Sequence, residues 1–156
     1  MINKRNPRAL MFVFAAICFA AMLTSGCTSV KVRPVDAGLD MSHIFIQKNE
    51  KVAAQDFISV LIDGCSRHGI STSVVTNGYT SGEKDFTLQY TALRNWDLGT
   101  YLTHAEIYIY RNRLLIGSAE YHLIADGGFS LFKWQGTEAK IGPVIDELLQ
   151  NYKPTK

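Results

Sequence analysis

Hydrophobic and polar residues alternate along the stretch from 86 to 125, and this period of two predicts β-strands. The apolar positions of its first part share one face: Phe86, Leu88, Tyr90 and Ala92. The alternation returns twice more, so we expect antiparallel strands at 86–94, 101–111 and 114–125. One face of each strand is apolar and the other is polar to aromatic, which is typical of a sheet covered on one side only.

Two other stretches have helical spacing. Apolar residues recur every four positions between 52 and 68: Phe57, Leu61 and Cys65. Gly69 follows, where a helix of this length should end. Near the C-terminus, apolar residues again recur at helical intervals after a candidate cap at Thr137: Ile141, Val144, Ile145, Leu148 and Leu149. Pro143 leaves two interpretations open, a kink in this helix or a regular part that begins at the proline.

Shorter β-type runs at 43–47 and 70–76 complete the element order β-α-β-β-β-β-α. Two amphipathic helices of this kind can both cover the apolar face of one sheet. We therefore predict an α+β fold, a two-layer sandwich with a mainly antiparallel sheet of four to five strands and two helices on one face.

Residues 1–26 have the pattern of a signal peptide. Three basic residues open the chain: Lys4, Arg5 and Arg8. They precede an uncharged run of 15 residues, 9–23, which is shorter than the ~20 residues needed to span a bilayer as a helix. Small residues and a cysteine follow at once, in the sequence Leu23-Thr24-Ser25-Gly26-Cys27.

This segment resembles the lipobox of bacterial lipoproteins, although Thr24 stands where leucine is commonest. The resemblance implies cleavage between Gly26 and Cys27, and N-acyl and S-diacylglyceryl lipid on Cys27. Thr28 is not the aspartate that retains such proteins in the inner membrane, so the resemblance implies an outer-membrane protein that faces the periplasm. In a Gram-positive organism it would imply the outer face of the plasma membrane.

The mature chain then divides into two parts. We interpret residues 27–42 as the lipidated cysteine and a tether, because they lack strong periodicity and contain Pro34. Val30 and Val32 leave open a second interpretation, the start of an edge strand. Residues 43–152 form the predicted single domain.

Composition and charge narrow the function classes. A hydrophobic content of 47% excludes a disordered chain. Loss of the three signal-peptide cations from the 16 Lys and Arg residues leaves 13 against 14 Asp and Glu, a net charge of −1. Such a domain is poorly suited to a phosphate backbone, so we expect no nucleic-acid partner. Cys65 is the one cysteine left beyond Cys27, and its place on an apolar stripe predicts a buried thiol.

Several segments resemble the Sbal-type family of small, uncharacterised proteobacterial lipoproteins. The resemblance rests on these stretches: Tyr90-Thr-Ala-Leu-Arg-Asn-Trp-Asp-Leu98, Tyr101-Leu102, Ala105-Glu106, Gly117-Ser-Ala-Glu-Tyr-His-Leu123 and Gly127-Gly-Phe-Ser-Leu-Phe-Lys-Trp134. It implies a lipoprotein address and one domain over nearly all of the mature chain. It implies no activity, cofactor or catalytic residue. The element order is also similar to that of envelope-assembly lipoproteins such as the lipopolysaccharide-transport plug, which is fold-level analogy.

The motifs of common enzymes are missing, and we expect no catalytic residues: the chain has no phosphate-binding Gly-rich loop with lysine, no G-x-S-x-G, no HExxH and no CxxC. A turn at Arg111-Asn112-Arg113 would set His104 opposite Glu120, with His122 diagonal to His104. Two histidines and a carboxylate of this kind form a candidate metal site. A solvent-exposed sheet face, on which polar residues commonly collect, explains the same pattern without a metal.

Aromatic residues form a second candidate site, a binding face made of Tyr108, Tyr110, Phe129, Phe132 and Trp134. Tyrosine and tryptophan are enriched at interfaces because each combines an apolar ring with a polar group. The segment 129–134 can instead fold back over the edge of the sandwich.

The sequence thus predicts a non-enzymatic envelope lipoprotein, held to the membrane by its lipid and binding a protein partner or an envelope component. Two rival hypotheses remain. One is a metal-binding or metal-dependent protein that uses His104, Glu120 and His122. The other is an immunity lipoprotein that neutralises a periplasmic toxin.

Overall fold

A computed structural model describes residues 28–53, 55–76, 79, 82, 85–124 and 131–154. The predicted signal peptide, its cleavage site after Gly26 and the predicted lipidation of Cys27 lie outside these residues. The described elements follow one another in this order: β1 (Thr28–Arg33), β2 (His43–Gln47), α2 (Gln55–Arg67), β3 (Ser71–Val75), β4 (Phe86–Trp96), β5 (Thr100–Arg111), β6 (Leu114–Leu123), the 3₁₀ helix η1 (Leu131–Trp134) and α3 (Thr137–Leu148).

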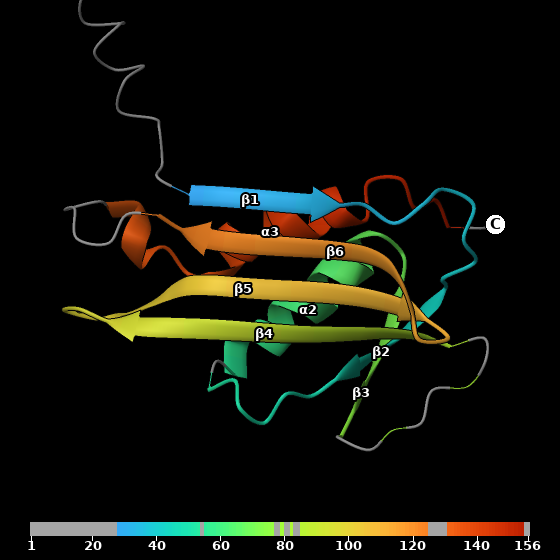
Figure 1. The fold of residues 1–156 in the computed structure, drawn as a ribbon, viewed down its shortest axis with the longest axis horizontal. Helices are drawn as coiled ribbons and strands as arrows, with labels where there is room; N and C mark the ends of the chain where they lie inside the picture. The colour runs from blue at the N-terminus through green and yellow to red at the C-terminus, as the bar shows by residue number, and fades with distance from the viewer. Residues whose placement is uncertain are drawn as a thin grey trace, which may run out of the picture.

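The strands form one open sheet of six strands in the order β1-β6-β5-β4-β2-β3 (Figure 1). The pairs among β4, β5, β6 and β1 are antiparallel. β2 runs parallel to both of its neighbours, β3 and β4. The sheet is therefore mixed, because α2 carries the chain from the end of β2 back to its start and β3 then runs in the same direction.

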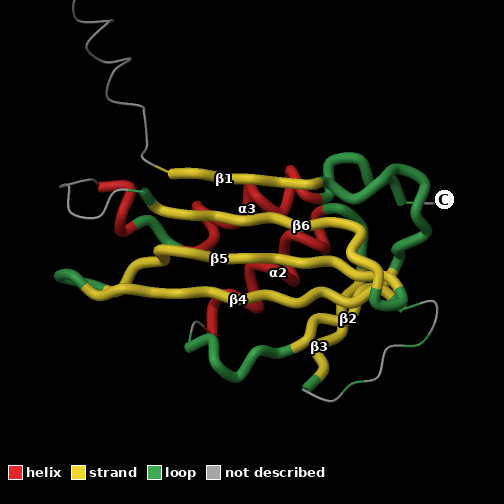
Figure 2. Tube along the Cα trace, viewed as in Figure 1, coloured by secondary structure: helices red, strands yellow, loops and turns green. Residues whose placement is uncertain are grey.

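Both helices lie on the same face of the sheet, behind the strands in Figure 1, and Figure 2 shows the same two layers. Phe57, Leu61 and Cys65 of α2 are all buried, which confirms the predicted stripe. The Phe57 ring stacks on Tyr90 of β4 with centroids 5.3 Å apart. From α3, Ile141, Ile145 and Leu148 enter the same core, so the predicted two-layer arrangement is confirmed.

The first strand corrects the predicted tether. Residues 28–33 form β1, which pairs with β6 at the edge of the sheet, and this is the second of the two interpretations given for Val30 and Val32. Val35 and Met41 farther along are fully buried in the core. Residues 28–42 therefore belong to the folded domain, which does not begin at residue 43, and the sheet has six strands in place of four to five.

The β5–β6 hairpin differs in register from the prediction. Its turn has two central residues, Asn112 and Arg113, both at positive φ (47° and 66°), where three loop residues were expected. A β-bulge between Ile109 and Tyr110 shifts the pairing by one further position. As a result His104 lies opposite His122 and Glu106 opposite Glu120.

The end of α2 agrees with the prediction, whereas the start of α3 differs from it. α2 ends before Gly69, whose φ of +74° is the left-handed conformation that terminates helices. Thr137 does not cap α3. It is the first helical residue, after Gly136, and its hydroxyl bonds Asp56 and Arg94 instead. Pro143 lies inside α3, so the regular helix does not begin at the proline.

Candidate functional site: a groove on the open face of the sheet

The face of the sheet opposite the helices carries the candidate site. Alternation along β5 buries Ile107 and Ile109 under the helices, and it turns Tyr108 and Tyr110 toward the other side. The two tyrosine rings are half-buried, with centroids 6.4 Å apart and planes tilted by 41°. Two neighbouring aromatic rings are thus available on this face.

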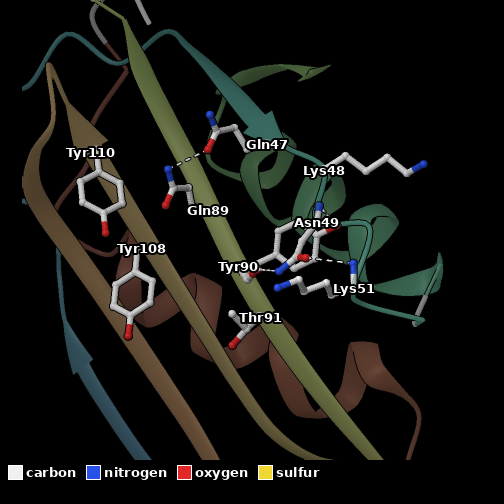
Figure 3. Close-up of a pocket in the computed structure, with 9 residues that line it drawn as sticks. All are labelled: Gln47, Lys48, Asn49, Lys51, Gln89, Tyr90, Thr91, Tyr108 and Tyr110. Carbon is white, nitrogen blue, oxygen red and sulfur yellow. Dashed lines mark hydrogen bonds between the residues drawn. The ribbon is translucent and has the colours of Figure 1, made fainter. Parts of the chain in front are cut away.

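A groove of about 510 Å³ runs from these tyrosines across β4 to the loop that follows β2 (Figure 3). Three separate segments supply its walls, so the fold and not one local motif creates it. It is lined by Gln47, Lys48, Asn49, Lys51, Gln89, Tyr90, Thr91, Tyr108 and Tyr110.

Hydrogen bonds hold the groove's polar wall in place. The Gln89 amide Nε2 donates to Gln47 Oε1 at 2.7 Å, across the β2–β4 pair. Asn49 Nδ2 donates to the carbonyl oxygen of Tyr90 at 2.9 Å, and Asn49 Oδ1 accepts from the backbone N–H of Lys51 at 3.0 Å. The loop after β2 is therefore tied to β4, and the amide groups are positioned before any ligand arrives (Figure 3).

The charged residues that line the groove are basic. Of the described residues that line it, none is acidic and two are lysines. Lys48 pairs with Glu50, which lies outside the lining, at 3.0 Å. Burial, and then the neighbouring Glu106 carboxylate through its charge and a side-chain hydrogen bond, raise the pKa of Tyr108.

A second hollow of about 300 Å³ lies on the other side of Tyr108. β1 and β6 form it, and two basic residues, Lys31 and Arg33, stand on its β1 wall. Lys31 is 3.6 Å from the Glu120 carboxylate, an exposed pair that contributes little to stability. Tyr108 therefore lies between two hollows, each with basic residues along its outer side.

The predicted metal site is only partly assembled. His104 and His122 come together, with ring centroids 5.6 Å apart, but they face each other directly and not diagonally. Glu120 lies opposite Glu106 because of the shifted register, and His104 Nε2 contacts Glu106 Oε1 at 3.3 Å. Within the described ranges, no three His, Cys, Asp or Glu side chains are grouped closely enough to hold a metal ion.

The predicted aromatic face does not form one surface. Tyr108 and Tyr110 share the groove, whereas Trp134 packs against the core and donates its Nε1–H to the carbonyl oxygen of Asp97 at 3.1 Å. Phe129 lies outside the described residues, as does the side chain of Phe132. For Trp134, the fold-back interpretation is the one that the structure supports.

Sequence reasoning missed the amide and lysine half of the groove. The signal was present in the polar run Gln47-Lys-Asn-Glu-Lys51 directly after a strand, but nothing in the sequence showed that β2 lies beside β4. Cys65 is buried as predicted, and burial raises the pKa of its thiol to about 12, which makes it unreactive. None of the helices in the described part of the chain is long and apolar enough to cross a membrane.

No protein-family model matches the chain, and no curated protein sequence matches it. Among solved structures, the chain is similar to PelC from Paraburkholderia phytofirmans, a dodecamer known in two crystal forms. Both give a TM-score of 0.54, at 10% and 9% sequence identity, and the match covers 83% of this chain and 99% of PelC. A minor lipoprotein from Acinetobacter baumannii matches at 13% identity over 70% of this chain and 87% of its own, but its TM-score of 0.30 carries no argument. The similarity to PelC shows a shared fold.

Proposed function

We propose that this protein is a non-enzymatic lipoprotein of the cell envelope, anchored through lipid on Cys27, whose groove binds a glycan that carries acidic groups. The observation that carries the proposal is the groove itself, in which three tyrosines, three side-chain amides and two lysines line one open hollow. The bound glycan is the envelope component that the sequence analysis left unspecified.

The chemistry of the lining favours a sugar chain over other ligands. A tyrosine ring packs against the apolar C–H face of a sugar, and its hydroxyl still reaches water or a ligand oxygen. Amides such as those of Gln47, Asn49 and Gln89 both donate and accept hydrogen bonds, as hydroxyl groups require. Lys48 and Lys51 supply positive charge for carboxylates or phosphates on the ligand.

The layout of the open face favours a polymer over a small molecule. The groove and the second hollow lie on opposite sides of Tyr108, so a chain of sugars can cross the sheet over that ring. Both hollows are shallow and open, which suits an extended ligand better than an enclosed one. Arg33 continues the positive charge beyond Tyr108, whereas Lys31 is paired with Glu120 in the same hollow.

The groove is tested by nuclear magnetic resonance titration of residues 27–156 with a hexameric oligouronate and, separately, with neutral cellohexaose. We expect amide shifts concentrated along the groove. Tyr108→Ala and Tyr110→Ala should each weaken binding about tenfold, because each removes a ring that the ligand covers. Lys51→Gln should weaken the acidic hexamer more than the neutral one.

Lys153→Gln is the matched control, since Lys153 is exposed near the C-terminus and outside the groove. Equal effects of Lys51→Gln and Lys153→Gln, or shifts scattered over the helix side, would contradict a groove-bound glycan. Oligomeric state should be measured alongside, because PelC, which shares the fold, is a dodecamer. Tight binding of a discrete protein at Tyr110 would favour the protein-partner or immunity hypothesis instead.

The anchor is tested separately by Cys27→Ser, which removes the thiol that would accept the diacylglyceryl group. The wild-type protein should incorporate labelled palmitate and partition with membranes as a shortened species, and the variant should do neither. A lipid-labelled, shortened Cys27→Ser protein would overturn the anchor and the envelope location together.

A further inference from the structure

Large apolar side chains are exposed at one end of the sheet, away from the groove. Trp96 and Leu98, at the turn between β4 and β5, are 76% and 80% exposed, and Ile124, directly after β6, is 59% exposed. We refer to residues 96–99 as the tip. Apolar side chains that are exposed at the same end of the sheet make this end a candidate for contact with another molecule or with a membrane.

The backbone of the tip adds an independent sign. Leu98 adopts a φ of 56°, a left-handed conformation that glycine or asparagine occupies more easily than leucine. A leucine at an exposed turn with such a backbone gains no packing within the protein. Contact with a molecule outside the described chain would account for an apolar side chain at this position.

The tip is held rigidly from behind by η1. Lys133 Nζ lies 2.7 Å from the Asp97 carboxylate and 4.4 Å from the centroid of the buried Tyr101 ring. Trp134 Nε1–H donates to the Asp97 carbonyl, and its ring lies beside Gly99. The one carboxylate of the tip is thus neutralised by a buried lysine, so the tip can enter an apolar environment without an unpaired charge.

The position of the tip relative to Cys27 identifies what covers it. β1 begins at Thr28, at the same end of the sheet as the tip (left in Figure 1), and Thr28 pairs with Leu123. The β4–β5 turn extends about three residues past this level, roughly 10 Å along the strands. Cys27 is one residue from Thr28, about 3.8 Å between Cα atoms, so a lipid on Cys27 has no tether to keep this end away from the bilayer.

We propose that the tip and Ile124 insert into the headgroup region of the same membrane that holds the lipid on Cys27. This proposal rests on the proposed anchor. A tryptophan and a leucine that project roughly 10 Å match the depth of about 5–10 Å to which interfacial segments enter a bilayer. Two attachment points at one end fix the domain's orientation and leave the open sheet face exposed alongside the membrane.

The test couples residues 27–156, through the Cys27 thiol, to a maleimide-headgroup lipid in vesicles of phosphatidylethanolamine and phosphatidylglycerol. The buried Cys65 does not compete for the maleimide. The chain has two tryptophans, so a Trp134→Phe background makes Trp96 the sole reporter. Trp96 emission should move to shorter wavelength on coupling, lose its quenching by aqueous iodide and become quenched by lipids brominated near the headgroup.

A pair of leucine variants distinguishes membrane binding through the tip from nonspecific binding by any exposed apolar side chain. For the uncoupled chain, Leu98→Ser should lower vesicle binding about tenfold. Leu114, at the opposite end of the sheet, is 69% exposed against 80% for Leu98, and Leu114→Ser should leave vesicle binding unchanged. Equal effects of the two variants would overturn the proposal. So would iodide quenching of vesicle-coupled Trp96 equal to that of the free chain, or a wavelength shift that depends on protein concentration without vesicles, which indicates a second copy of the chain.

Because the lipid is attached chemically, this result does not depend on processing in cells. Loss of palmitate labelling in the wild-type protein would overturn the anchor and leave the vesicle result standing. Iodide-accessible Trp96 in a palmitate-labelled protein would overturn the insertion and leave the anchor standing.

Discussion

The two faces of the sheet use the same strands for opposite purposes. On β5, Ile107 and Ile109 are 1% and 0% exposed beneath the helices, whereas Tyr108 and Tyr110, their neighbours in sequence, line an open groove. The side that packs on α2 and α3 is a continuous apolar core, and the opposite side is a mixture of amides, tyrosines and charges. Because side chains alternate between the two faces, one strand contributes residues to the stabilising core and, at the next positions, to the candidate binding groove.

The difference between the two faces predicts which substitutions affect folding and which affect ligand binding. A change on the covered face removes contacts from a close-packed core and therefore lowers the free energy of unfolding. A change on the open face removes surface that water already partly reaches, so we expect it to affect ligand binding more than folding.

The largest effect is expected from Leu61→Ala on α2. Leu61 is fully buried against the covered face, and its truncation leaves a cavity that should lower the free energy of unfolding by about 2–5 kcal/mol. Denaturant midpoints of residues 27–156 measure this loss. A decrease below about 1 kcal/mol would mean that the covered face is not the main source of stability.

A smaller effect is expected from Tyr108→Ala, on the opposite face. The half-buried ring contributes cross-strand contacts, so unfolding free energy should fall by roughly 1 kcal/mol or less. The same denaturant measurement compares the two variants directly. A loss as large as that of Leu61→Ala would show that something covers the open face, and the groove would then not be free to bind a ligand.

The smallest effect depends on pH and lies at the rim between the two layers. Asp56 at the start of α2 contacts Arg94 of β4 at 2.7 Å and also bonds Thr137 of α3. Burial alone would raise the pKa of Asp56, but the hydrogen bonds from Thr137 and Arg94 and the Arg94 charge together lower it below 3.8. Ionised Asp56 therefore stabilises the fold above pH 3.8, and this contribution is lost as the pH falls through the lower, folded-state pKa.

Asp56→Asn should accordingly destabilise the protein at pH 7 by only about 0.5 kcal/mol, because half of this side chain is exposed to water. The difference between variant and wild type should shrink as the pH falls below 3.8 through the lowered pKa of Asp56, because the carboxyl then becomes neutral like the amide. Denaturant midpoints measured from pH 7 down into this acid range follow the change. A difference that grows toward low pH would show that the pKa of Asp56 is raised in the folded state.

Periodicity predicted most of the covered face. The three long strands and both helices appear within a few residues of their expected bounds, because alternation and helical spacing directly report which side chains enter the core. The same logic placed Phe57, Leu61 and Cys65 correctly. β1 was harder, since two valines beside Pro34 support a tether and an edge strand equally.

The open face was less predictable because it depends on register and on long-range pairing. A two-residue turn that puts Arg113 at positive φ has no strong sequence signature, and the bulge at Tyr110 has none. Those two shifts moved Glu120 away from His104. The groove forms because β2 lies beside β4, and the hydrophobic pattern does not reveal this long-range pairing. The pattern also does not reveal the left-handed backbone conformation of Leu98 at the tip.

The open face of the sheet is proposed to bind a glycan in the cell. A photo-crosslinking amino acid at Tyr110, with Ser66 on the exposed side of α2 as the control position, tests it most directly. We expect high-mass adducts from position 110 and none from position 66. The molecule crosslinked at position 110 should survive protease digestion but should be lost on glycan hydrolysis. Equal adducts from both positions, or adducts from position 110 that only protease removes, would contradict it.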